Sequence, residues 1–389
     1  MKILHTVEFY FPSRGGAQEV VRRISEELVK RGHEVTVATT KLAERQTRSL
    51  NGVRIEEFAA SGNAVRGFAG EVARYQQFLC TGNFDVMMNY AAQQWATDLV
   101  YAVIYRLPYR KIMAPCGFSA LFDRRYESYF RDLPKVLRKY DRLIFHSHSG
   151  RDVEFARTHG IERHSVIPNG ASFEEFAEPD LSFRSRHNIP REQPLLLTVG
   201  SHTGAKGHSL TMEAFRRAKI GPATFVIIGN TVGSPGCLPR CYVQAKLVEL
   251  TTFAKKQVML LNPPRKDVVS AYHSADLFVF GSSIECSPIV LFEAAASRTP
   301  FLSSNCGNAA EIAEWTGGGR VLPKGADRKH VEVLPPATAT SMANEIEELL
   351  SDKAALESMG EAGFQAWKSR FTWENIAAQY EQVYRSVVS

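Results

Sequence analysis

The segment KILHTVEFYFPSRGGAQEVVRRISEELVKRGHEVTVA, residues 2–38, decides the fold class of this chain. It reads as an apolar strand over 2–7, a helix over 17–31 that Gly15 and Gly16 introduce, and a second strand over 34–38. The apolar residues at 20, 21, 24 and 28 share one helix face, and Gly32 ends the helix. A strand–helix–strand unit of this kind predicts a parallel sheet covered by helices.

The same alternation continues along the chain and restarts once. Further strands are predicted at 53–58, 86–89, 111–114, 142–146 and 165–167, before the turn sequence IPNG at 167–170. The second series has strands at 194–199, 223–229, 258–261, 277–280 and 300–303, with helices at 210–218, 266–274 and 288–297. Open α/β sheets bind ligands beyond the carboxyl ends of their strands. We therefore predict an α/β protein with two Rossmann-like domains that meet near residue 169 and face each other across a cleft. Residues 372–388 read as a final amphipathic helix.

Composition and charge narrow the class of protein. The chain has 389 residues, of which 44% are hydrophobic and 23% charged, the proportions of a globular protein. A formal charge of +6 is mild for this length and predicts no nucleic-acid partner. Because the sequence shows no export signal and no apolar window long enough to span a bilayer, we expect a cytoplasmic protein.

Six cysteines stand at 80, 116, 237, 241, 286 and 306. In the reducing cytosol we expect no disulfides. Cys237 and Cys241 form a CxxxC pair, but no matching Cys/His pair follows it downstream. We therefore predict no metal site, and interpret the pair as two small thiols in a loop over 231–241.

One segment is locally basic and has two interpretations. Its basic residues are Arg124, Arg125, Arg131, Lys135, Arg138, Lys139 and Arg142, with aromatic and aliphatic residues between them. It could lie peripherally on an anionic membrane surface. Alternatively, it is an ordinary amphipathic helix whose basic residues form the solvated face.

The segment ECSPIVLFE, residues 285–293, carries the strongest candidates for chemistry. Ser287 is a good N-cap and Pro288 a good first helical residue, so Glu285 lies in the preceding loop and Glu293 inside the helix. A carboxylate among apolar neighbours needs a partner, and ribose hydroxyls would be suitable donors. The helix start offers N–H groups to a phosphate or sugar oxygen. Alternatively, Glu293 forms a salt bridge to a neighbouring helix.

Two glycine-rich loops follow predicted strands. GSHTGAKGH, residues 200–208, carries Lys206, which could reach a diphosphate as a point charge or could be a solvated turn lysine. PSRGGA, residues 12–17, combines Arg14 with Gly15 and Gly16, which let backbone approach a ligand closely or form a plain turn. The first loop lacks the Walker A pattern, and the second lacks the GxGxxG spacing of nicotinamide sites.

A fourth loop, APCGFS at 114–119, also follows a predicted strand. We interpret Cys116 as a small wall residue rather than a reactive thiol, because nothing nearby in the sequence would activate it.

Taken in order, these segments resemble family 4 of the retaining glycosyltransferases, which have the two-Rossmann GT-B fold. The resemblance runs through nearly the whole chain. It rests on the glycine loop at 15–16, VIPNG at 166–170, the loop at 200–207, the EX7E signature at 285–293, and the segment 303–311.

The resemblance implies a metal-independent enzyme that moves a sugar from a nucleoside-diphosphate sugar, its co-substrate, with no other cofactor. The acceptor would be a glycan, a lipid-linked molecule or a small molecule, in surface polysaccharide or glycoconjugate biosynthesis. Residues 1–168 with 370–389 would form the acceptor domain, because the final helix crosses back to it, and residues 169–369 the donor domain.

The resemblance also implies roles for single residues. Glu293 would hold the ribose hydroxyls, Lys206 would neutralise the diphosphate, and Glu285 would contact the donor sugar. The other donor-binding positions are Arg14, Gly15, Gly16, Gly200, Ser201, Ser287, Ile289 and Val290.

Three positions depart from the family pattern. Ser201 stands where an arginine is usual, a loss for which Arg14 or His202 could compensate, and Cys116-Gly117 stands where a His-Gly near the reacting carbon is usual. Gly281 stands where a proline is usual, a change that we expect to be harmless. Two other functions therefore stay open: an epimerase or phosphorylase on the same fold, and a non-catalytic protein that binds a sugar nucleotide or a partner.

Overall fold

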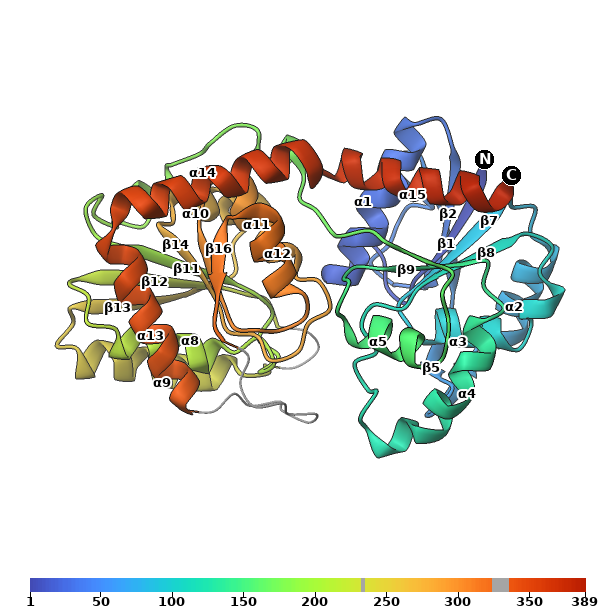
Figure 1. Cartoon of the computed structure of the whole chain (residues 1–389), viewed down its shortest axis with the longest axis horizontal. Helices are drawn as coiled ribbons and strands as arrows, with labels where there is room; N and C mark the ends of the chain where they lie inside the picture. Colours follow the sequence, from blue (N-terminus) through green and yellow to red (C-terminus); the bar gives the residue numbers. More distant parts are fainter. Residues whose placement is uncertain (232–234, 324–335) are drawn as a thin grey trace. The chain divides into compact units, whose positions relative to one another are not determined.

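The computed structural model describes residues 1–231, 235–323 and 336–389 and divides the chain into two α/β units (Figure 1). Unit 1 consists of Met1–Asn169 together with Trp373–Ser389, and unit 2 of Gly170–Thr372. Each unit has its own sheet and its own buried apolar core. The predicted α/β class, with two parallel-sheet domains, is confirmed.

Unit 1 is built on an eight-stranded sheet in the order β10-β9-β8-β7-β1-β2-β4-β3. All of its neighbouring strands run parallel except β3, which pairs antiparallel with β4. The strands are β1 Lys2–Thr6, β2 Glu34–Thr40, β3 Ser49–Leu50, β4 Val53–Phe58, β7 Val86–Tyr90, β8 Arg110–Ala114, β9 Arg142–Phe145 and β10 His164–Val166. A separate antiparallel hairpin joins β5 Ala60–Asn63 to β6 Gly67–Gly70.

The helices of unit 1 are α1 Gly16–Lys30, α2 Val72–Thr81, α3 Trp95–Tyr101, α4 Glu127–Leu137, α5 Arg151–Thr158 and α15 Trp373–Val388, with short 3₁₀ turns at Ile104–Arg106 and Arg124–Tyr126. Helix α15 returns from unit 2 and packs on α1 (Figure 1). Between them lies His5, which hydrogen-bonds to Ser25 Oγ at 2.8 Å and to Tyr384 OH at 2.9 Å. Burial lowers the pKa of His5 to about 3, so the ring is neutral in the fold.

Unit 2 is built on a six-stranded parallel sheet in the order β13-β12-β11-β14-β15-β16. Its strands are β11 Leu195–Val199, β12 Ala223–Ile228, β13 Lys256–Leu261, β14 Leu277–Phe280, β15 Phe301–Ser303 and β16 Gly319–Val321. Its helices are α6 Phe173–Phe176, α7 Phe183–Arg186, α8 His208–Arg217, α9 Leu238–Thr251, α10 Arg265–Ser274, α11 Ile289–Ala296, α12 Ala309–Thr316, α13 Pro336–Ser351 and α14 Lys353–Arg370. The central strands are mostly apolar, with one threonine each in β11 and β12, because helices cover both faces of the sheet.

Each sheet has a point where the strand order reverses. In unit 1 it lies between β1 and β7, and in unit 2 between β11 and β14. The loops that leave two such strands diverge to opposite faces, and the crevice between them is the usual ligand site of an open α/β sheet. Within each unit, the topology therefore marks one short stretch of the carboxyl edge as the place to look for a ligand site.

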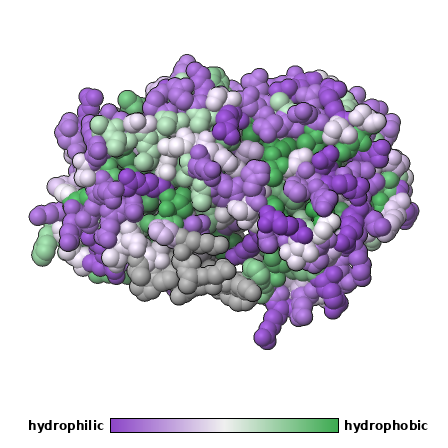
Figure 2. Space-filling model, viewed as in Figure 1, coloured by the Kyte–Doolittle hydropathy of each residue, from purple (hydrophilic) through white to green (hydrophobic). Residues whose placement is uncertain are grey.

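The surface in Figure 2 is mostly hydrophilic on the visible face, with smaller hydrophobic areas between the polar side chains. Among the described residues, no helix has the length and hydropathy needed to cross a bilayer.

Candidate active site

In unit 2, the loops after β11 and β14 meet at the reversal point, and two glycines make the approach possible. Gly207 has a φ of +69°, and a Cβ there would lie 1.8 Å from the carbonyl oxygen of Gly281. Ser283 N also donates to the carbonyl of Ala205 at 2.9 Å. The loop at 200–207 is therefore held against the loop at 281–288 by direct backbone contact.

This contact brings together two predicted site residues that lie far apart in the sequence. Lys206 Nζ donates to Glu285 Oε1 at 2.6 Å, and Ser282 Oγ donates to the same oxygen at 2.8 Å. The lysine side chain keeps 30% of its exposure and the glutamate 13%. The pair therefore combines an ammonium group that a ligand can reach with a carboxylate that fixes its position.

Glu293 lies in α11 and is 7% exposed. Its Oε1 accepts from Arg265 Nη2 at 2.5 Å, and the same nitrogen donates to Glu175 Oε2 at 2.7 Å. Burial alone would lower the pKa of Arg265, but the two carboxylates raise it above its ordinary value. Glu293 thus forms a salt bridge to a neighbouring helix, which is one of the two alternatives predicted from the sequence. The Arg265 guanidinium pairs with two carboxylates, those of Glu293 and Glu175.

The start of α11 differs by one residue from the prediction. The helix begins at Ile289 with Pro288 as its N-cap, so Ser287 lies one position before the cap. Ser287 is buried, while Ile289 and Val290 are half-buried. Leu291 N donates to the carbonyl of Pro288 at 3.2 Å, whereas the N–H groups before it in the first turn precede any possible helical partner. The partial positive charge at this helix start suits an anionic oxygen.

The residues around Ser201 correct one suggestion made from the sequence. Ser201 Oγ donates to Asn230 Oδ1 at 2.7 Å, which ties the loop after β11 to the loop after β12. Gly200 N donates to the carbonyl of Ile228 at 2.9 Å. His202 is 2% exposed, and burial lowers its pKa. A buried neutral imidazole does not replace the cation that an arginine would supply at Ser201.

The structure also changes the interpretation of the two paired cysteines. Cys237 is the N-cap of α9 and Cys241 lies inside that helix, so the predicted loop over 231–241 ends earlier than expected. Of that loop, residues 232–234 lie outside the described residues. Cys237 and Cys241 lie against His202 and His208, which come before them in the sequence. A metal-site pattern that requires the second ligand pair downstream of the cysteines therefore does not detect these histidines.

In unit 1, the loop after β1 carries Arg14, Gly15 and Gly16, all exposed. Gly15 is the N-cap of α1 in an extended conformation, and the helix begins at Gly16, one residue before the predicted start. A Cβ at Gly16 would meet nothing within 4 Å. The start of α1 therefore presents uncovered backbone beside an exposed arginine side chain at the reversal point of this sheet.

Cys116 begins an unusual turn after β8. Cys116, Gly117 and Phe118 all have positive φ values, of 60°, 90° and 47°. Asp152 stabilises this turn, because its Oδ2 accepts from Gly117 N at 2.9 Å. Burial raises the pKa of Asp152. Cys116 and Phe118, on either side of Gly117, are non-glycine residues in the left-handed region, and strained backbone of this kind concentrates at functional sites. No local sequence signal marks Asp152 as a residue that stabilises this turn.

The basic segment forms a 3₁₀ turn and α4 with their apolar side turned inward. Tyr126, Tyr129, Phe130, Leu133 and Leu137 are buried in the core of unit 1. The basic residues from Arg124 to Lys139 are exposed. Because the aromatic residues pack inside the domain, the arrangement favours the ordinary amphipathic helix.

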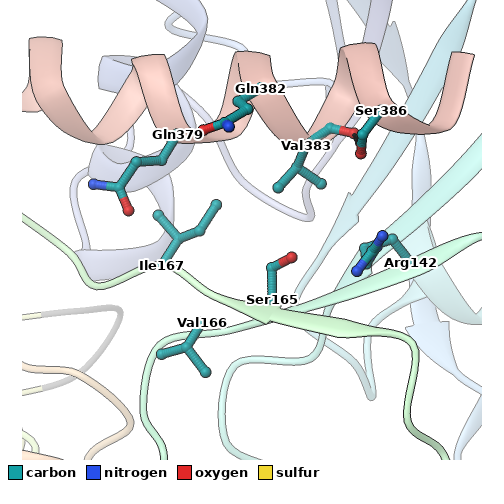
Figure 3. A pocket seen from close by; sticks show the side chains of 8 residues that line it. All are labelled: Arg142, Ser165, Val166, Ile167, Gln379, Gln382, Val383 and Ser386. Atoms are coloured by element: carbon teal, nitrogen blue, oxygen red, sulfur yellow. Dashed lines mark hydrogen bonds between the residues drawn. The ribbon is translucent and has the colours of Figure 1, made fainter. Parts of the chain in front are cut away.

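A separate hollow of about 340 Å³ lies in unit 1 between β10 and α15. Figure 3 shows Gln379, Gln382, Val383 and Ser386 on the helix, opposite Arg142 and residues 165–167. None of the predicted site residues lines it, so it does not belong to the site described above.

Comparison with known proteins agrees with this architecture. The family model described as Glycosyl transferases group 1 matches residues 180–366, and that for Glycosyltransferase Family 4 matches residues 14–175. A D-inositol 3-phosphate glycosyltransferase of Corynebacterium urealyticum is 28% identical over 61% of this chain, but the match spans only 54% of that relative. An uncharacterised glycosyltransferase of Methanocaldococcus jannaschii is 24% identical over 97% of both chains. The solved structure of Anabaena HepE in complex with UDP-glucose superposes with a TM-score of 0.77 at 16% identity, covering 99% of this chain and 100% of that one.

Proposed function

Because this chain belongs to the family 4 glycosyltransferases, we propose that it transfers a glycosyl group from a nucleoside-diphosphate sugar to an acceptor hydroxyl, with retention of configuration and without a required metal ion. The observation that carries this proposal is the contact of Lys206 with Glu285 at the reversal point of the unit 2 sheet. A half-exposed ammonium group at that position suits the diphosphate of a donor. The HepE complex with UDP-glucose supports the same class of ligand.

We assign the donor to unit 2. Glu293 would accept hydrogen bonds from the ribose hydroxyls, with Arg265 holding its carboxylate in place. The first turn of α11, with Ser287, Ile289 and Val290, and the loop with Gly200 and Ser201 would hold sugar or phosphate oxygens through main-chain amides. Ser201 offers no charge, so Lys206 carries the main cationic role.

In the proposed reaction, the bond between the anomeric carbon and the diphosphate oxygen breaks, and the acceptor oxygen bonds to that carbon on the same face. The acceptor proton passes to the leaving phosphate. Lys206 and the start of α11 stabilise the negative charge that develops on the leaving group, which is electrostatic catalysis by preorganised groups. Before the donor binds, Glu285 holds the lysine. On binding, the diphosphate shares the lysine, and Glu285 contacts the donor sugar.

We propose that unit 1 supplies the acceptor-side residues, among them Cys116. The acceptor would be a glycan, a lipid-linked molecule or a small molecule, in surface polysaccharide or glycoconjugate synthesis. The inositol phosphate named for the Corynebacterium relative is one small acceptor to include in a screen.

Donor binding is tested first. The full chain and Glu293→Gln, which keeps the shape of the side chain and removes its charge, are melted with UDP, GDP, ADP, CMP or NAD, without added metal. We expect one nucleoside diphosphate to raise the wild-type Tm, and the variant to lose most of that shift, because a ligand stabilises the folded state in proportion to its occupancy. No shift with any nucleotide would favour a non-catalytic protein.

Turnover is tested next with the sugar donors of the base identified. Lys206→Ala and Glu293→Ala are each expected to lower kcat by roughly 10²-fold or more, in line with lost transition-state electrostatics. Lys246→Ala, which removes an exposed lysine of α9, is the matched control. Near-normal rates in both site variants would refute the residue assignment.

A further inference from the structure

Four metal-binding side chains from two loops converge beside the proposed donor site. His202 follows β11, His208 is the first residue of α8, Cys237 caps α9, and Cys241 lies one turn into that helix. Their ligand atoms all lie within 4.8 Å of one another. The two sequence segments are spaced as H-x5-H and C-x3-C, and neither segment alone has enough ligands for a closed site.

Four of the six separations between the ligand atoms are close to the edges of a tetrahedron, and the two from Cys241 Sγ to the imidazole nitrogens lie within 4.8 Å. The Nδ1 atoms of His202 and His208 are 3.2 Å apart, and the two Sγ atoms are 3.7 Å apart. Cys237 Sγ lies 3.6 Å from Nδ1 of His202 and 3.8 Å from Nδ1 of His208. With Zn–N bonds of about 2.0–2.1 Å and Zn–S bonds of about 2.3 Å, a tetrahedral site has edges of about 3.3, 3.8 and 3.5 Å for N–N, S–S and N–S. Each observed distance lies within about 0.3 Å of its edge.

Burial agrees with a ligand set. His202 is 2% exposed, His208 1% and Cys241 fully buried. Neutral imidazoles and thiolates are the forms that bind metal ions, and a bound dication supplies the charge that a buried thiolate needs.

Hydrogen bonds from outside the cluster do not hold the His208 ring in place. Its Nε2 is buried and has no hydrogen-bond partner among the described residues, and its Nδ1 faces His202 and Cys237. A disulfide between Cys237 and Cys241 would use the two sulfurs but give no reason for two imidazoles to face them. A single cation uses all four groups.

We propose that His202, His208, Cys237 and Cys241 bind one Zn²⁺ ion. Four protein ligands leave no open position, so the ion is structural and takes no part in the transfer reaction. It fastens the loop at 200–208 to the start of α9, beside the existing hydrogen bond from Cys237 N to the carbonyl of His202 at 3.0 Å. In the sequence, Lys206 stands between the ligands His202 and His208. If the proposed function holds, the ion therefore also fixes the loop that carries the lysine facing the diphosphate.

The test measures metal content directly. The full chain is expressed without a histidine tag and purified without chelators, and zinc is measured by inductively coupled plasma mass spectrometry. We expect about one zinc per chain in the wild type, and less than about a tenth of that in a Cys237→Ser/Cys241→Ser double variant. Cys80→Ser, which removes a half-buried thiol in unit 1, is the control and should keep its zinc.

A second measurement covers the case in which the double variant does not fold. Cobalt replaces zinc in the wild type, and tetrahedral thiolate coordination gives strong visible bands with sulfur-to-cobalt charge transfer. Cys237→His keeps four ligands, and should keep one metal per chain with weaker charge transfer. Wild-type protein without zinc that also binds no cobalt would overturn the proposal, as would an intact mass showing a Cys237–Cys241 disulfide in its place. Zinc content and nucleotide binding are measured independently, so failure of one proposal is distinguishable from failure of the other.

Discussion

The close approach of the two loops in unit 2 gives a prediction that a matched pair of variants can test. Gly207 and Gly204 lie in the same loop, with φ values of +69° and +79°. A Cβ at Gly207 would lie 1.8 Å from the carbonyl oxygen of Gly281, whereas a Cβ at Gly204 would meet nothing within 4 Å. Alanine at either position has the same chemistry and the same unfavourable φ, so the pair isolates the effect of the contact.

The expected magnitudes follow from this geometry. Left-handed backbone costs an alanine about 1–2 kcal/mol, which both variants bear. At Gly207, the loops must also separate by about 1.6 Å to restore an ordinary contact, and overpacking of this kind costs about 1–3 kcal/mol more. The effect of alanine on the unfolded chain is the same in both variants and cancels in their difference. Gly204→Ala should therefore lower the stability of unit 2 by about 1–2 kcal/mol, and Gly207→Ala by about 2–5 kcal/mol.

Differential scanning calorimetry measures the difference. For a domain of this size, each kcal/mol lowers Tm by about 2–4 °C, so Gly207→Ala should melt at least about 2 °C below Gly204→Ala. If the proposed function holds, Gly207→Ala should also lower kcat/KM more strongly, because a displacement of about 1 Å can cost about 10²-fold. Equal Tm values for the two variants would refute the reasoning, since the contact with Gly281 would then carry no energy.

Three further predictions concern stability. Lys256→Met should lower the free energy of unfolding, measured by urea titration, by about 1–3 kcal/mol. The reason is that the buried ammonium group of Lys256 donates hydrogen bonds to carbonyls at the end of α8. A variant as stable as the wild type would mean that water satisfies these carbonyls instead. Burial raises the pKa of Asp98 from 3.8 to about 6, so the folded state binds the carboxyl proton more tightly than the unfolded chain does. The stability that the protonated carboxyl contributes is therefore lost as the pH rises from about 4 through about 6. Asp98→Asn should remove that part of the pH dependence of Tm between pH 4 and 7, and identical pH profiles would contradict the assignment. Tyr384→Phe should lower the Tm of unit 1, because Nε2 of His5 loses a buried partner at 2.9 Å, and an unchanged Tm would show that the hydrogen bond contributes nothing.

Much of the fold could be predicted because its signals are local. The strand at 277–280 was predicted with its observed bounds, since a short apolar run between turn residues suffices to define it. The hairpin of β5 and β6 was missed, because its Ala-Ser-Gly-Asn and Gly-Phe-Ala-Gly segments lack the usual β-branched pattern. Strand order is a property of the whole chain, and no local pattern encodes it.

The same limit applies to the site. Lys206 and Glu285 could be singled out separately, but their contact depends on β11 lying beside β14. Glu293 could be recognised as a carboxylate in need of a partner, whereas Arg265 could not be chosen among many basic residues. The partners of the cysteine pair come before it in the sequence, as the H-x5-H of His202 and His208. This spacing is visible in the sequence, but its position next to the cysteines depends on the fold.

The return of α15 to unit 1 has a consequence for synthesis on the ribosome. Residues up to Asn169 emerge first, but the helix that covers α1 and His5 is made about 200 residues later. At about 5–20 residues per second, this interval lasts about 10–40 s. Unit 2 is continuous in the chain and can fold as it emerges, so we expect the second unit to be completed before the first. During the interval, the apolar face of α1 stays without its cover, and this face is where we expect a chaperone to bind the nascent chain.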